Sequence, residues 1–528
     1  MARWFGKHWI LLTVVATPLV YAPLSGRGGE ERARQRSLDT LAEVMTLVQK
    51  EAVEPPNAKQ VTHASIQGML HTLDPHSNYM DEAEFRSLRE DQRGTFYGIG
   101  AMIQQQPDGV VITSIVRGGP AEKMGLRPGD TFKDIDGKTA EGLSSAQVVQ
   151  RLRGDKGTVV EVSVQRPGYA ETLKFSITRA EIPSNSIYYS FMLTPTTGFI
   201  TVKDFGETTS EEFQKAITSL KRQGMKELIL DLRYNPGGLL DAAIGICRQL
   251  LGPNEIIVSQ RGREAKQVSV TRTPAGSSLD PFPLVVLINR GSASASEIVT
   301  GAVQDHDRGL VVGTTSWGKG LVQTVLPIGR SRGLALTVAH YYTPSGRCIQ
   351  RDYQHGLDDY LLPDDGKQPD QPKGPAYRTD LNRVVYGGGG IQPDYVVDQG
   401  KLTTFVATLR GRYGAFFKFA LAEKEKLAVK PQEVASDATL ARFQEWLKAE
   451  KIPFTEAEWK DAANQNDMRD QITYELQNMA FGIEAGWRYL CSRDPQVQKA
   501  LQVFPEAEQL QKRRQLVKPG AGSAQAKL

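Results

Sequence analysis

The spacing of apolar and polar residues changes along the chain and predicts segments of different structure. Apolar residues recur every three or four positions in residues 37–90 and again in residues 402–512, which predicts helices. Residues 97–179 favour a small β domain with a helix at 144–153. Residues 196–350 alternate short apolar runs with amphipathic stretches, which is typical of a mainly parallel α/β core.

Individual elements of this core follow from the same pattern. Strands are expected at 227–232, 283–289 and 310–312, and helices at 239–251 and 297–304. The predicted division of the chain is an export segment at 1–34, a helical region at 35–95, a small β domain at 96–182, an α/β core at 183–398 with a surface insertion at 352–382, a second helical region at 399–512 and a disordered tail at 513–528.

The first residues have the charge order of an export signal. Arg3 and Lys7 precede the apolar stretch from Trp9 to Leu24, and the polar, Gly-rich segment after it argues against a buried helix. The stretch is short for a membrane-spanning helix, which needs about 20 residues. Residues 20–22 resemble a cleavage site but Pro23 disfavours cleavage, so a removed signal peptide and a retained membrane anchor both stay open. Either one predicts the bacterial periplasm or the outer face of the inner membrane.

Composition narrows the classes of function. A net charge of +4 over 528 residues is close to balanced, and no basic stripe with interleaved aromatic residues is present, which argues against nucleic acid as a partner. The three cysteines, Cys247, Cys348 and Cys491, lie far apart and form neither a metal-ligand spacing nor a disulfide framework. We therefore expect neither a metal nor a cofactor.

A serine cluster and a lysine stand at two neighbouring turns of the predicted core. The apolar run that ends at Asn289 is followed by R-G-S-A-S-A-S-E, and Lys319 lies between two glycines ahead of another apolar run. A serine and a lysine are the minimum for a hydrolase in which lysine replaces the histidine of the usual triad as general base. The sequence therefore indicates nucleophilic catalysis by a Ser–Lys pair.

Lys319 can act as a base only if its pKa is lowered. Lysine ordinarily has a pKa near 10.4, so about one side chain in a thousand is unprotonated at neutral pH. Burial disfavours the charged form, and Gly318 and Gly320 allow backbone to pack closely around the amine. Residues two and four positions apart on a strand share a face, so Gln323 can hydrogen-bond the amine and orient it.

The pattern alone does not separate the alternating serines Ser292, Ser294 and Ser296. A serine near the start of the following helix is favoured, because exposed N–H groups there can hold a developing oxyanion. Further free N–H groups are expected at Gly237 and Gly238, which lie between a buried strand and a helix.

Each of these features also has a simpler interpretation. The segment 294–297 fits a helix capping box, Lys319 alone is typical of a solvated turn, and residues 235–238 alone are typical of a plain turn. Residues 313–320 nearly match the phosphate-binding loop G-x-x-x-x-G-K-[ST], but a glycine replaces the final hydroxyl residue, which argues against nucleotide binding. The joint occurrence of the three turns at successive strand ends favours catalysis.

A peptide-binding module is predicted ahead of the core. The segment Tyr97-Gly98-Ile99-Gly100 opens a strand, and further Gly-rich turns and a helix from Ser144 follow it. A Gly-rich turn leaves backbone N–H groups free to hold a terminal carboxylate, and the strand edge can pair with an extended peptide. The ordered set is therefore typical of a module that binds protein C-termini.

With these motifs in this order, the chain resembles the carboxy-terminal processing (tail-specific) proteases, which are Ser–Lys peptidases with a PDZ domain. The resemblance covers residues 37–397 and implies an α/β fold similar to the spiral fold of Clp protease and crotonase subunits. The motifs that carry it are G-M-L-H-T-L-D-P-H-S-N-Y at 68–79, Y-G-I-G and G-L-R-P-G-D in the small β domain, L-D-L-R-Y-N-P-G-G, N-R-G-S-A-S-A-S-E, G-K-G-L-V-Q and Y-Y-T-P-S-G-R in the core, and G-I-Q-P-D at 390–394.

The resemblance also implies roles for individual residues. Ser294, 25 residues before Lys319, is the implied nucleophile, Lys319 the general base and Gln323 its orienting partner. The implied oxyanion hole consists of the N–H groups of Ala295 and of the Gly237–Gly238 turn, with Gly238 favoured. The implied binding site for the substrate C-terminus is formed by Tyr97, Gly98, Ile99 and Gly100, and Arg166 is implied to take part in gating by the PDZ domain.

The implied function is an exported serine endopeptidase that recognises substrate C-termini through its PDZ domain and processes or degrades proteins from that end. The implied partners are proteins with exposed apolar C-termini, a second copy of the chain in a homodimer, and an adaptor protein. The alternative is a catalytically silent PDZ scaffold, which is expected to lack Ser294, Lys319 or Gln323. A trypsin-like PDZ protease needs its PDZ domain after a G-x-S-G-G serine, and this chain has neither that order nor that motif.

Overall fold

The computed structural model describes most of the chain between residues 27 and 516. The gaps are 55, 265–267, 278, 354–359, 361–373, 424–425 and 427–428. Most of the predicted export segment, of the insertion at 352–382 and of the C-terminal tail lies outside the described residues. Within the described part, no helix is both long enough and apolar enough to cross a bilayer. The chain divides into two units, residues 1–73 and residues 74–528.

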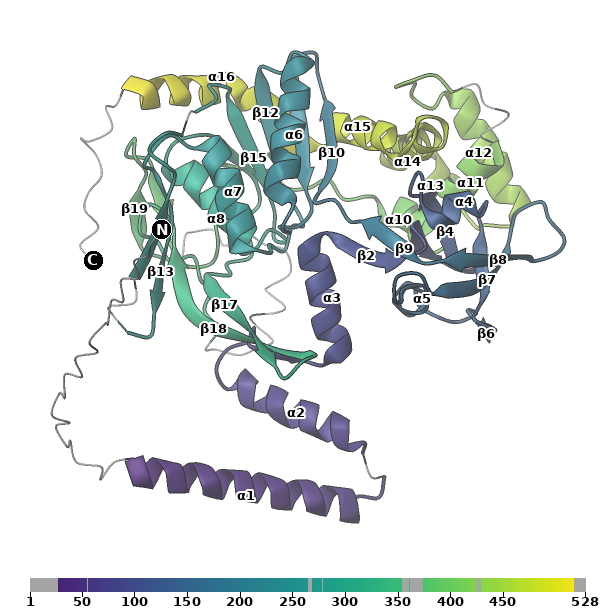
Figure 1. Cartoon of the computed structure of the whole chain (residues 1–528). Helices are drawn as coiled ribbons and strands as arrows, with labels where there is room; N and C mark the ends of the chain where they lie inside the picture. Colours follow the sequence, from purple (N-terminus) through teal and green to yellow (C-terminus); the bar gives the residue numbers. More distant parts are fainter. Residues whose placement is uncertain are drawn as a thin grey trace, which may run out of the picture. The chain divides into compact units, whose positions relative to one another are not determined.

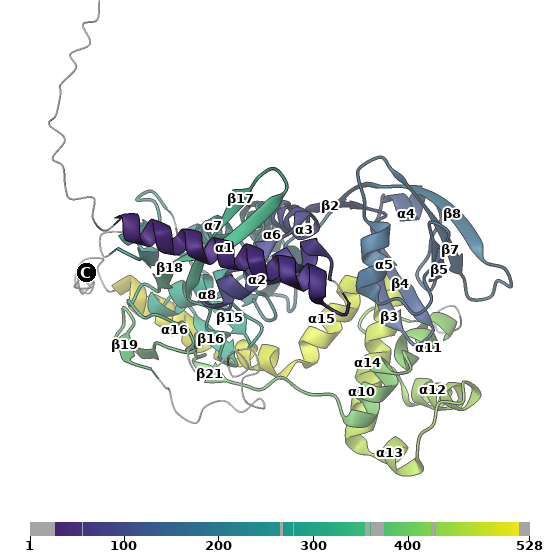
Figure 2. The ribbon, with the colours of Figure 1, turned by 90° about the horizontal axis from the view of Figure 1, so that it is seen from below.

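The first unit consists of two helices, as its apolar periodicity predicts. Helix α1 spans Arg27–Glu51 and helix α2 spans Ala58–His71, and Figure 2 shows α1 as one continuous helix. The side chain of Asn57 starts α2 by accepting a hydrogen bond from the N–H of Lys59 at 2.8 Å.

The centre of the second unit is a six-stranded, mainly parallel sheet, which confirms the predicted α/β class. Its strand order is β10-β11-β12-β15-β16-β21, and only β10 runs antiparallel to its neighbour. The strands are β10 (Ile187–Met192), β11 (Thr197–Val202), β12 (Glu227–Asp231), β15 (Leu284–Ile288), β16 (Leu310–Gly313) and β21 (Tyr395–Val396).

Helices cover both faces of this sheet (Figure 1). Helices α6 (Thr209–Arg222), α7 (Leu240–Leu250) and α8 (Ala295–Asp305) share a hydrophobic core with one face. Helix α16 (Pro495–Leu516) packs against the other face, where Val503 and Phe504 join a core with strand residues such as Ile229. The last part of the predicted C-terminal helical region therefore completes the core instead of standing apart from it.

A second, antiparallel sheet carries the hairpin that follows Lys319. Its order is β1-β18-β13-β14, and β17 also pairs with β18. The strands are β1 (Asn78–Met80), β13 (Ile256–Gly262), β14 (Val268–Arg272), β17 (Leu321–Ile328) and β18 (Arg332–Tyr342). Helix α3 (Glu82–Arg93) follows β1, and β19 (Ala376–Arg378) and β20 (Val384–Tyr386) form a separate hairpin.

The small β domain lies between β1 and the central sheet in the sequence. Its sheet has the order β3-β4-β5-β7-β8, with β6 paired to β5, and helices α4 (Pro120–Lys123) and α5 (Ser145–Leu152) belong to it. Strands β2 (Thr95–Gly98) and β9 (Ala180–Pro183) pair with each other where the chain enters and leaves the domain. The sheet strands are β3 (Ala101–Gln106), β4 (Gly109–Ile115), β5 (Thr131–Ile135), β6 (Lys138–Thr139), β7 (Val159–Gln165) and β8 (Leu173–Thr178).

The remaining C-terminal helices have a core of their own. They are α10 (Thr404–Gly411), α11 (Ala415–Glu423), α12 (Asp437–Ala449), α13 (Glu456–Lys460) and α14 (Ala462–Phe481), gathered together in Figure 2, with α15 (Ile483–Arg493) leading on to α16. Buried aromatic rings dominate this core, in which Phe443 stacks on Phe416 and meets Phe419 edge-on.

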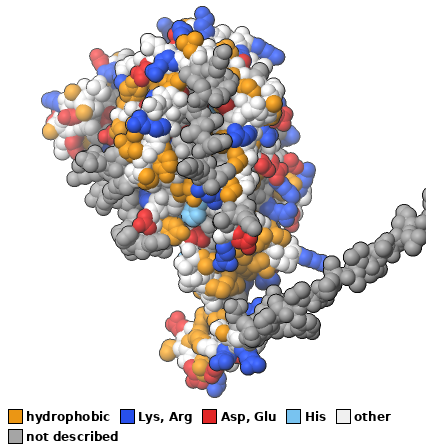
Figure 3. All heavy atoms as spheres, turned by 90° about the vertical axis from the view of Figure 1, so that its left-hand side faces the viewer, with side chains coloured by type: hydrophobic (Ala, Val, Ile, Leu, Met, Phe, Trp, Pro, Cys, Tyr) orange, Lys and Arg blue, Asp and Glu red, His pale blue; other side chains and the backbone are white. Residues whose placement is uncertain are grey.

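The surface carries both signs of charge. On the face shown in Figure 3, lysine and arginine side chains are interspersed with aspartate and glutamate and form no continuous stripe. This distribution agrees with the nearly balanced charge of the whole sequence.

Candidate active site

The three serines of the cluster have different environments. Ser292 and Ser296 are fully buried, and their hydroxyls donate to the carbonyl oxygens of Leu232 at 2.8 Å and Asn235 at 2.9 Å. Ser294 is partly exposed. The structure therefore distinguishes serines that the sequence pattern leaves equivalent, because two of the hydroxyls fasten the turn and only that of Ser294 faces the accessible side.

Ser294 stands at the sharp turn between β15 and α8. Its φ of +56° is unusual for a residue with a side chain, and such strained positions are frequent at active sites. As N-cap of α8 it has the geometry of a capping box, and its N–H donates to the Glu297 carboxylate at 2.8 Å. The capping interpretation of 294–297 therefore holds, and it leaves the catalytic interpretation intact.

Glu297 has a second role that its capping motif does not reveal. Its fully buried carboxylate also accepts hydrogen bonds from Ser316 Oγ at 2.5 Å, Gly318 N at 2.7 Å and Lys319 N at 2.9 Å. Burial raises the pKa of Glu297, and these four hydrogen bonds act in the opposite direction. The available sequence signal is a glutamate in the first turn of a helix whose other positions before Asp305 are small, apolar or uncharged.

The lysine turn follows β16 and leads into β17. Lys319 is partly buried, and burial lowers the pKa of its amine, while the charges of Glu297 and Asp74 oppose the shift. Gly318 lets the turn approach other backbone closely, since a Cβ there would come within 2.9 Å of Gly390 N. Lys319 Nζ donates to Gln323 Oε1 at 2.9 Å, and in the described contacts it forms no hydrogen bond with the Ser294 hydroxyl.

Gln323 reaches the lysine although its strand is not regular. The pairing of β17 with β18 shifts register between Val322 and Gln323, so the alternation assumed from the sequence is interrupted there. The hydrogen bond to Lys319 is nevertheless formed, and the other end of the amide donates to the carbonyl oxygen of His76 at 2.5 Å. No pattern in the sequence predicts His76 at this site.

The glycine turn after β12 lies against the serine turn. A Cβ on Gly237 would stand 2.7 Å from the Cβ of Ser294. The N–H of Gly237 is occupied, because it donates to the Asn235 side chain at 2.9 Å. The N–H groups of Gly238 and Ala295 donate to no group of the described residues. These two donors are the ones that remain for an oxyanion.

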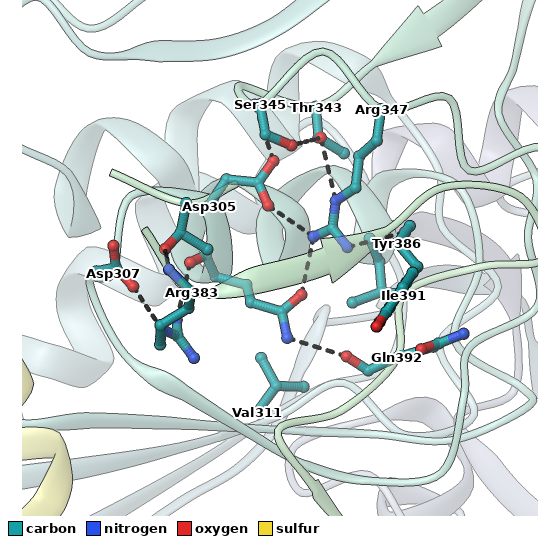
Figure 4. Close-up of polar contacts among 12 residues, drawn as sticks. Asp305, Asp307, Val311, Thr343, Ser345, Arg347, Arg383, Tyr386, Ile391 and Gln392 are labelled. Atoms are coloured by element: carbon teal, nitrogen blue, oxygen red, sulfur yellow. Dashed lines mark hydrogen bonds and ion pairs between the residues drawn. The ribbon is translucent and has the colours of Figure 1, made fainter. Parts of the chain in front are cut away.

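The far end of α8 is fixed by a buried polar network (Figure 4). The fully buried guanidinium of Arg347, from the Y-Y-T-P-S-G-R segment, donates to Asp305 Oδ1 at 2.7 Å and to Gln304 Oε1 at 2.8 Å. Ser345 N donates to the other oxygen of Asp305 at 3.0 Å. Satisfied buried networks of this kind are rigid, so the helix that begins at Ser294 is held at both ends.

The Tyr97–Gly100 segment forms the entry to the small β domain. Tyr97 and Gly98 belong to β2, and Ile99 is buried at 3% exposure. The carbonyl of Ile99 accepts from Ala121 N at 2.8 Å, whereas the N–H groups of Ile99 and Gly100 have no acceptor among the described residues. The segment thus presents the free donors that a carboxylate-binding turn requires.

Arg166 lies within the small β domain, apart from the residues around Ser294 and Lys319. It donates to both oxygens of the fully buried Asp130, at 2.7 and 2.8 Å, and to the carbonyl of Gly125 at 2.9 Å. It also lines a cavity of about 540 Å³ between this domain and helices α11 and α14, together with Phe417 and Glu475. Burial raises the pKa of Glu475 to about 7.

The sequence is similar to known proteins over the core and the small β domain. The family model described as Peptidase family S41 matches residues 196–359, and that of the PDZ domain matches residues 89–165. A carboxy-terminal-processing protease of Bartonella bacilliformis is 37% identical over 324 residues, which cover 61% of this chain and 74% of that protein. The carboxy-terminal processing protease CtpB of Bacillus subtilis is 34% identical over 323 residues, which cover 60% of this chain and 66% of CtpB.

Solved structures include a similar chain. The photosystem II D1 C-terminal processing protease has 29% sequence identity to this protein and a TM-score of 0.36. The match covers 66% of this chain and 84% of that one.

Proposed function

Since the chain belongs to the carboxy-terminal processing proteases of peptidase family S41, we propose that it is an exported serine endopeptidase in which Ser294 is the nucleophile and Lys319 the general base. The observation that carries the proposal is the shared carboxylate oxygen of Glu297, which accepts hydrogen bonds from the N–H groups of both residues. This contact supports the pairing because it holds the serine turn beside the lysine turn.

In the proposed reaction, the Ser294 hydroxyl attacks the carbonyl carbon of the scissile peptide bond and its proton passes to Lys319 Nζ. The oxyanion is stabilised by the N–H groups of Gly238 and Ala295. Protonated Lys319 then gives its proton to the leaving amine, and the acyl-enzyme forms. A water molecule, deprotonated by Lys319, hydrolyses the ester and releases Ser294.

The lysine must be neutral for this chemistry, and its surroundings support that state. A base that works near pH 7 needs a pKa about three units below the ordinary lysine value, which corresponds to about 4 kcal/mol. Burial acts in the required direction. Gln323 is uncharged, so it orients the amine without favouring the protonated form as a carboxylate would.

We assign substrate recognition to the PDZ domain, with the C-terminal carboxylate at the N–H groups of Ile99 and Gly100. Its substrates are then proteins with exposed apolar C-termini, cut in the periplasm or at the outer face of the inner membrane. The N-terminal segment would serve as export signal or membrane anchor. The proposed partners are a second copy of the chain in a homodimer and an adaptor protein on the added helical regions.

The proposal is tested with a peptide that ends in an apolar residue and with the same peptide amidated at its C-terminus. Wild type should cleave the free form faster, and Ser294→Ala should bind it with unchanged affinity and not cleave it. Ser292→Ala is the matched control, since its hydroxyl only fastens the turn, and it should remain active. Cleavage by Ser294→Ala would refute the proposed nucleophile. Tail binding by wild type without any cleavage would favour the alternative, a silent PDZ scaffold.

A further inference from the structure

The amide of Gln323 lies between two partners that fix its orientation. Its Oε1 accepts from Lys319 Nζ at 2.9 Å, and its Nε2 donates to the carbonyl oxygen of His76 at 2.5 Å. A carbonyl oxygen can only accept, so the NH₂ end of the amide must face His76 and the oxygen must face the lysine. The backbone of His76 therefore selects which end of Gln323 meets the amine.

This selection affects the availability of the lysine lone pair. A neutral amine has N–H bonds to donate and one lone pair with which to take a proton. When Gln323 Oε1 faces Lys319, the amine donates an N–H bond and its lone pair stays free. A reversed amide would donate to the lone pair and occupy the position at which a general base accepts its proton.

Asp74 closes the turn that holds the His76 carbonyl. Its Oδ1 accepts from the N–H groups of His76 and Ser77, both at 2.8 Å, and its Oδ2 accepts from the Ser77 hydroxyl at 2.6 Å. Asp74 is 4% exposed and Ser77 is fully buried. Aspartate commonly closes turns in this way, and three hydrogen bonds to one buried carboxylate leave the His76 peptide little freedom.

The turn is docked on the strand that pairs with Gln323. The Ser77 oxygen accepts from Thr337 N at 3.2 Å, and Thr337 is the partner of Gln323 in the β17–β18 ladder. Strand β1 continues from the turn at Asn78 and pairs with Ala335 of β18. One sheet thus sets the positions of the turn and of the amide side by side.

We infer that Asp74 is a positioning residue for the general base, acting through the His76 carbonyl to present the oxygen of Gln323 to Lys319. The inference rests on the proposed function, because it assigns a support to Lys319 as the base. The inferred role of Asp74 also assigns a function to the L-D-P-H-S segment, which takes no part in the proposed Ser–Lys chemistry itself.

The charge of Asp74 provides a second readout. Burial raises the pKa of Asp74, but hydrogen bonds from Ser77 and the backbone outweigh it, and the net shift is downward, so the group is ionised at neutral pH. The charged groups around Lys319 are the carboxylates of Glu297 and Asp74, which raise its pKa against the lowering by burial. His76 is neutral there, because burial and the lysine charge lower its pKa to about 4.

The test compares Asp74→Asn with Asp74→Ala in the full-length protein, by kcat, KM and the pH profile of kcat/KM on a free-tail peptide. Asparagine keeps an oxygen for the two N–H groups, so Asp74→Asn should keep most of kcat. Asp74→Ala frees the His76 carbonyl and should lower kcat by about 10²-fold with little change in KM. Both variants remove a negative charge beside Lys319, so in both the acidic limb of the profile should move to lower pH.

Two further variants separate positioning from stability. Ser77→Ala keeps the charge and loosens the turn, so it should lower kcat without moving the acidic limb. Asp461→Ala removes the carboxylate that caps α14 at Asn464 N, far along the chain from the site, and should reduce stability without changing kcat or the profile. Ser77→Ala is also the test that applies if Asp74→Ala does not fold.

Full kcat in folded Asp74→Ala, or equal losses in the Asn and Ala variants with no shift of the profile, would overturn the inference. Full kcat in Ser77→Ala would also count against it. Ser294→Ala is assayed in parallel, since activity that survives in that variant overturns the proposed function itself. Ser294-dependent cleavage together with an unaffected Asp74→Ala variant overturns only the role of Asp74.

Discussion

The backbone N–H groups of Ser294 and Lys319 donate to the same atom, Oε2 of Glu297, at 2.8 and 2.9 Å. The two nitrogens therefore lie within about two hydrogen-bond lengths of each other. The other oxygen of this buried carboxylate accepts from Ser316 Oγ and Gly318 N. A single acceptor thus sets the separation between the turn of the proposed nucleophile and the turn of the proposed base.

We expect Glu297→Gln to lose most activity. The amide has the shape of the carboxylate but only one acceptor oxygen, so its NH₂ group would face either the N–H groups of Ser294 and Lys319 or the Gly318 N–H and the Ser316 hydroxyl. Displacement of the two turns should lower kcat by about 10²-fold, and the buried donors left without a partner should lower the free energy of unfolding by about 3 kcal/mol. Peptide cleavage and denaturant unfolding measure the two effects.

Glu458→Gln is the matched control, because Glu458 also completes a capping box, where it accepts from Thr455 N at 2.8 Å on an exposed helix. It should behave like wild type in both assays. Wild-type activity in Glu297→Gln would show that the shared carboxylate does not hold the two turns in register.

We expect Lys319→Met to be inactive yet more stable than wild type at neutral pH. Burial lowers the pKa of Lys319 in the folded protein, whereas the unfolded chain keeps a value near 10.4. Between these two pKa values the unfolded chain binds more protons than the folded protein, so the stability of wild type rises with pH. Below the lower pKa the amine is charged in both states, and the cost of burying its charge destabilises the folded protein in full. The advantage of Lys319→Met should therefore shrink as the pH approaches about 10.

Denaturant unfolding at pH 7 and at about pH 10 checks this expectation. Lys138→Met, at an exposed position on β6, is the control and should show little difference between the two conditions. A constant effect of Lys319→Met at both pH values would mean that the folded protein does not disfavour the charged amine.

We expect Gly237→Ala to inactivate and destabilise the protein. The added Cβ would lie 2.7 Å from Ser294 Cβ and 2.8 Å from Ala293 O, and the φ of +102° disfavours any side chain. The serine turn has to move, so kcat should fall with little change in tail binding. Gly276→Ala, where a Cβ meets nothing within 4 Å, is the control and should be neutral. Normal turnover by Gly237→Ala would place the nucleophile elsewhere.

The sequence predicts the meeting of Ser294, Lys319 and the Gly237–Gly238 turn for a general reason. In a parallel sheet the segments that follow successive strands lie at one edge, so β12, β15 and β16 bring their turns together. The strand after Lys319 is also predicted from its pattern, and Gln323 meets the amine although a register shift interrupts the alternation just before it. The fold class and the reach of Gln323 follow from local patterns.

Contacts between segments that are distant in the sequence cannot be predicted from local patterns. His76 and Gln323 are separated by 247 positions, and nothing in either motif specifies the other. The apolar face of α16 is visible in the sequence, but the pattern does not say that the central sheet covers it. The capping motif at Glu297 is likewise local, whereas its contacts with Ser316 and Gly318 depend on the folded core.

The proposed regulatory role of Arg166 depends on its ion pair with Asp130. Its planar guanidinium binds both oxygens of buried Asp130, and lysine cannot reproduce that fork although it keeps the charge. Because Arg166 lines the cavity between the small β domain and helices α11 and α14, weakening its pair with Asp130 should alter how the domain is held more than which peptide it binds. We expect Arg166→Lys to bind a free-tail peptide normally but to cleave free and amidated peptides at more similar rates than wild type. Arg151→Lys, at a half-buried arginine of α5 that donates to the Thr139 carbonyl at 2.9 Å, should keep the wild-type ratio of the two cleavage rates. If Arg166→Lys cleaves free and amidated peptides with the same rate ratio as wild type, Arg166 has only a structural role. The ion pair with Asp130 would then stabilise the domain without coupling peptide binding to cleavage.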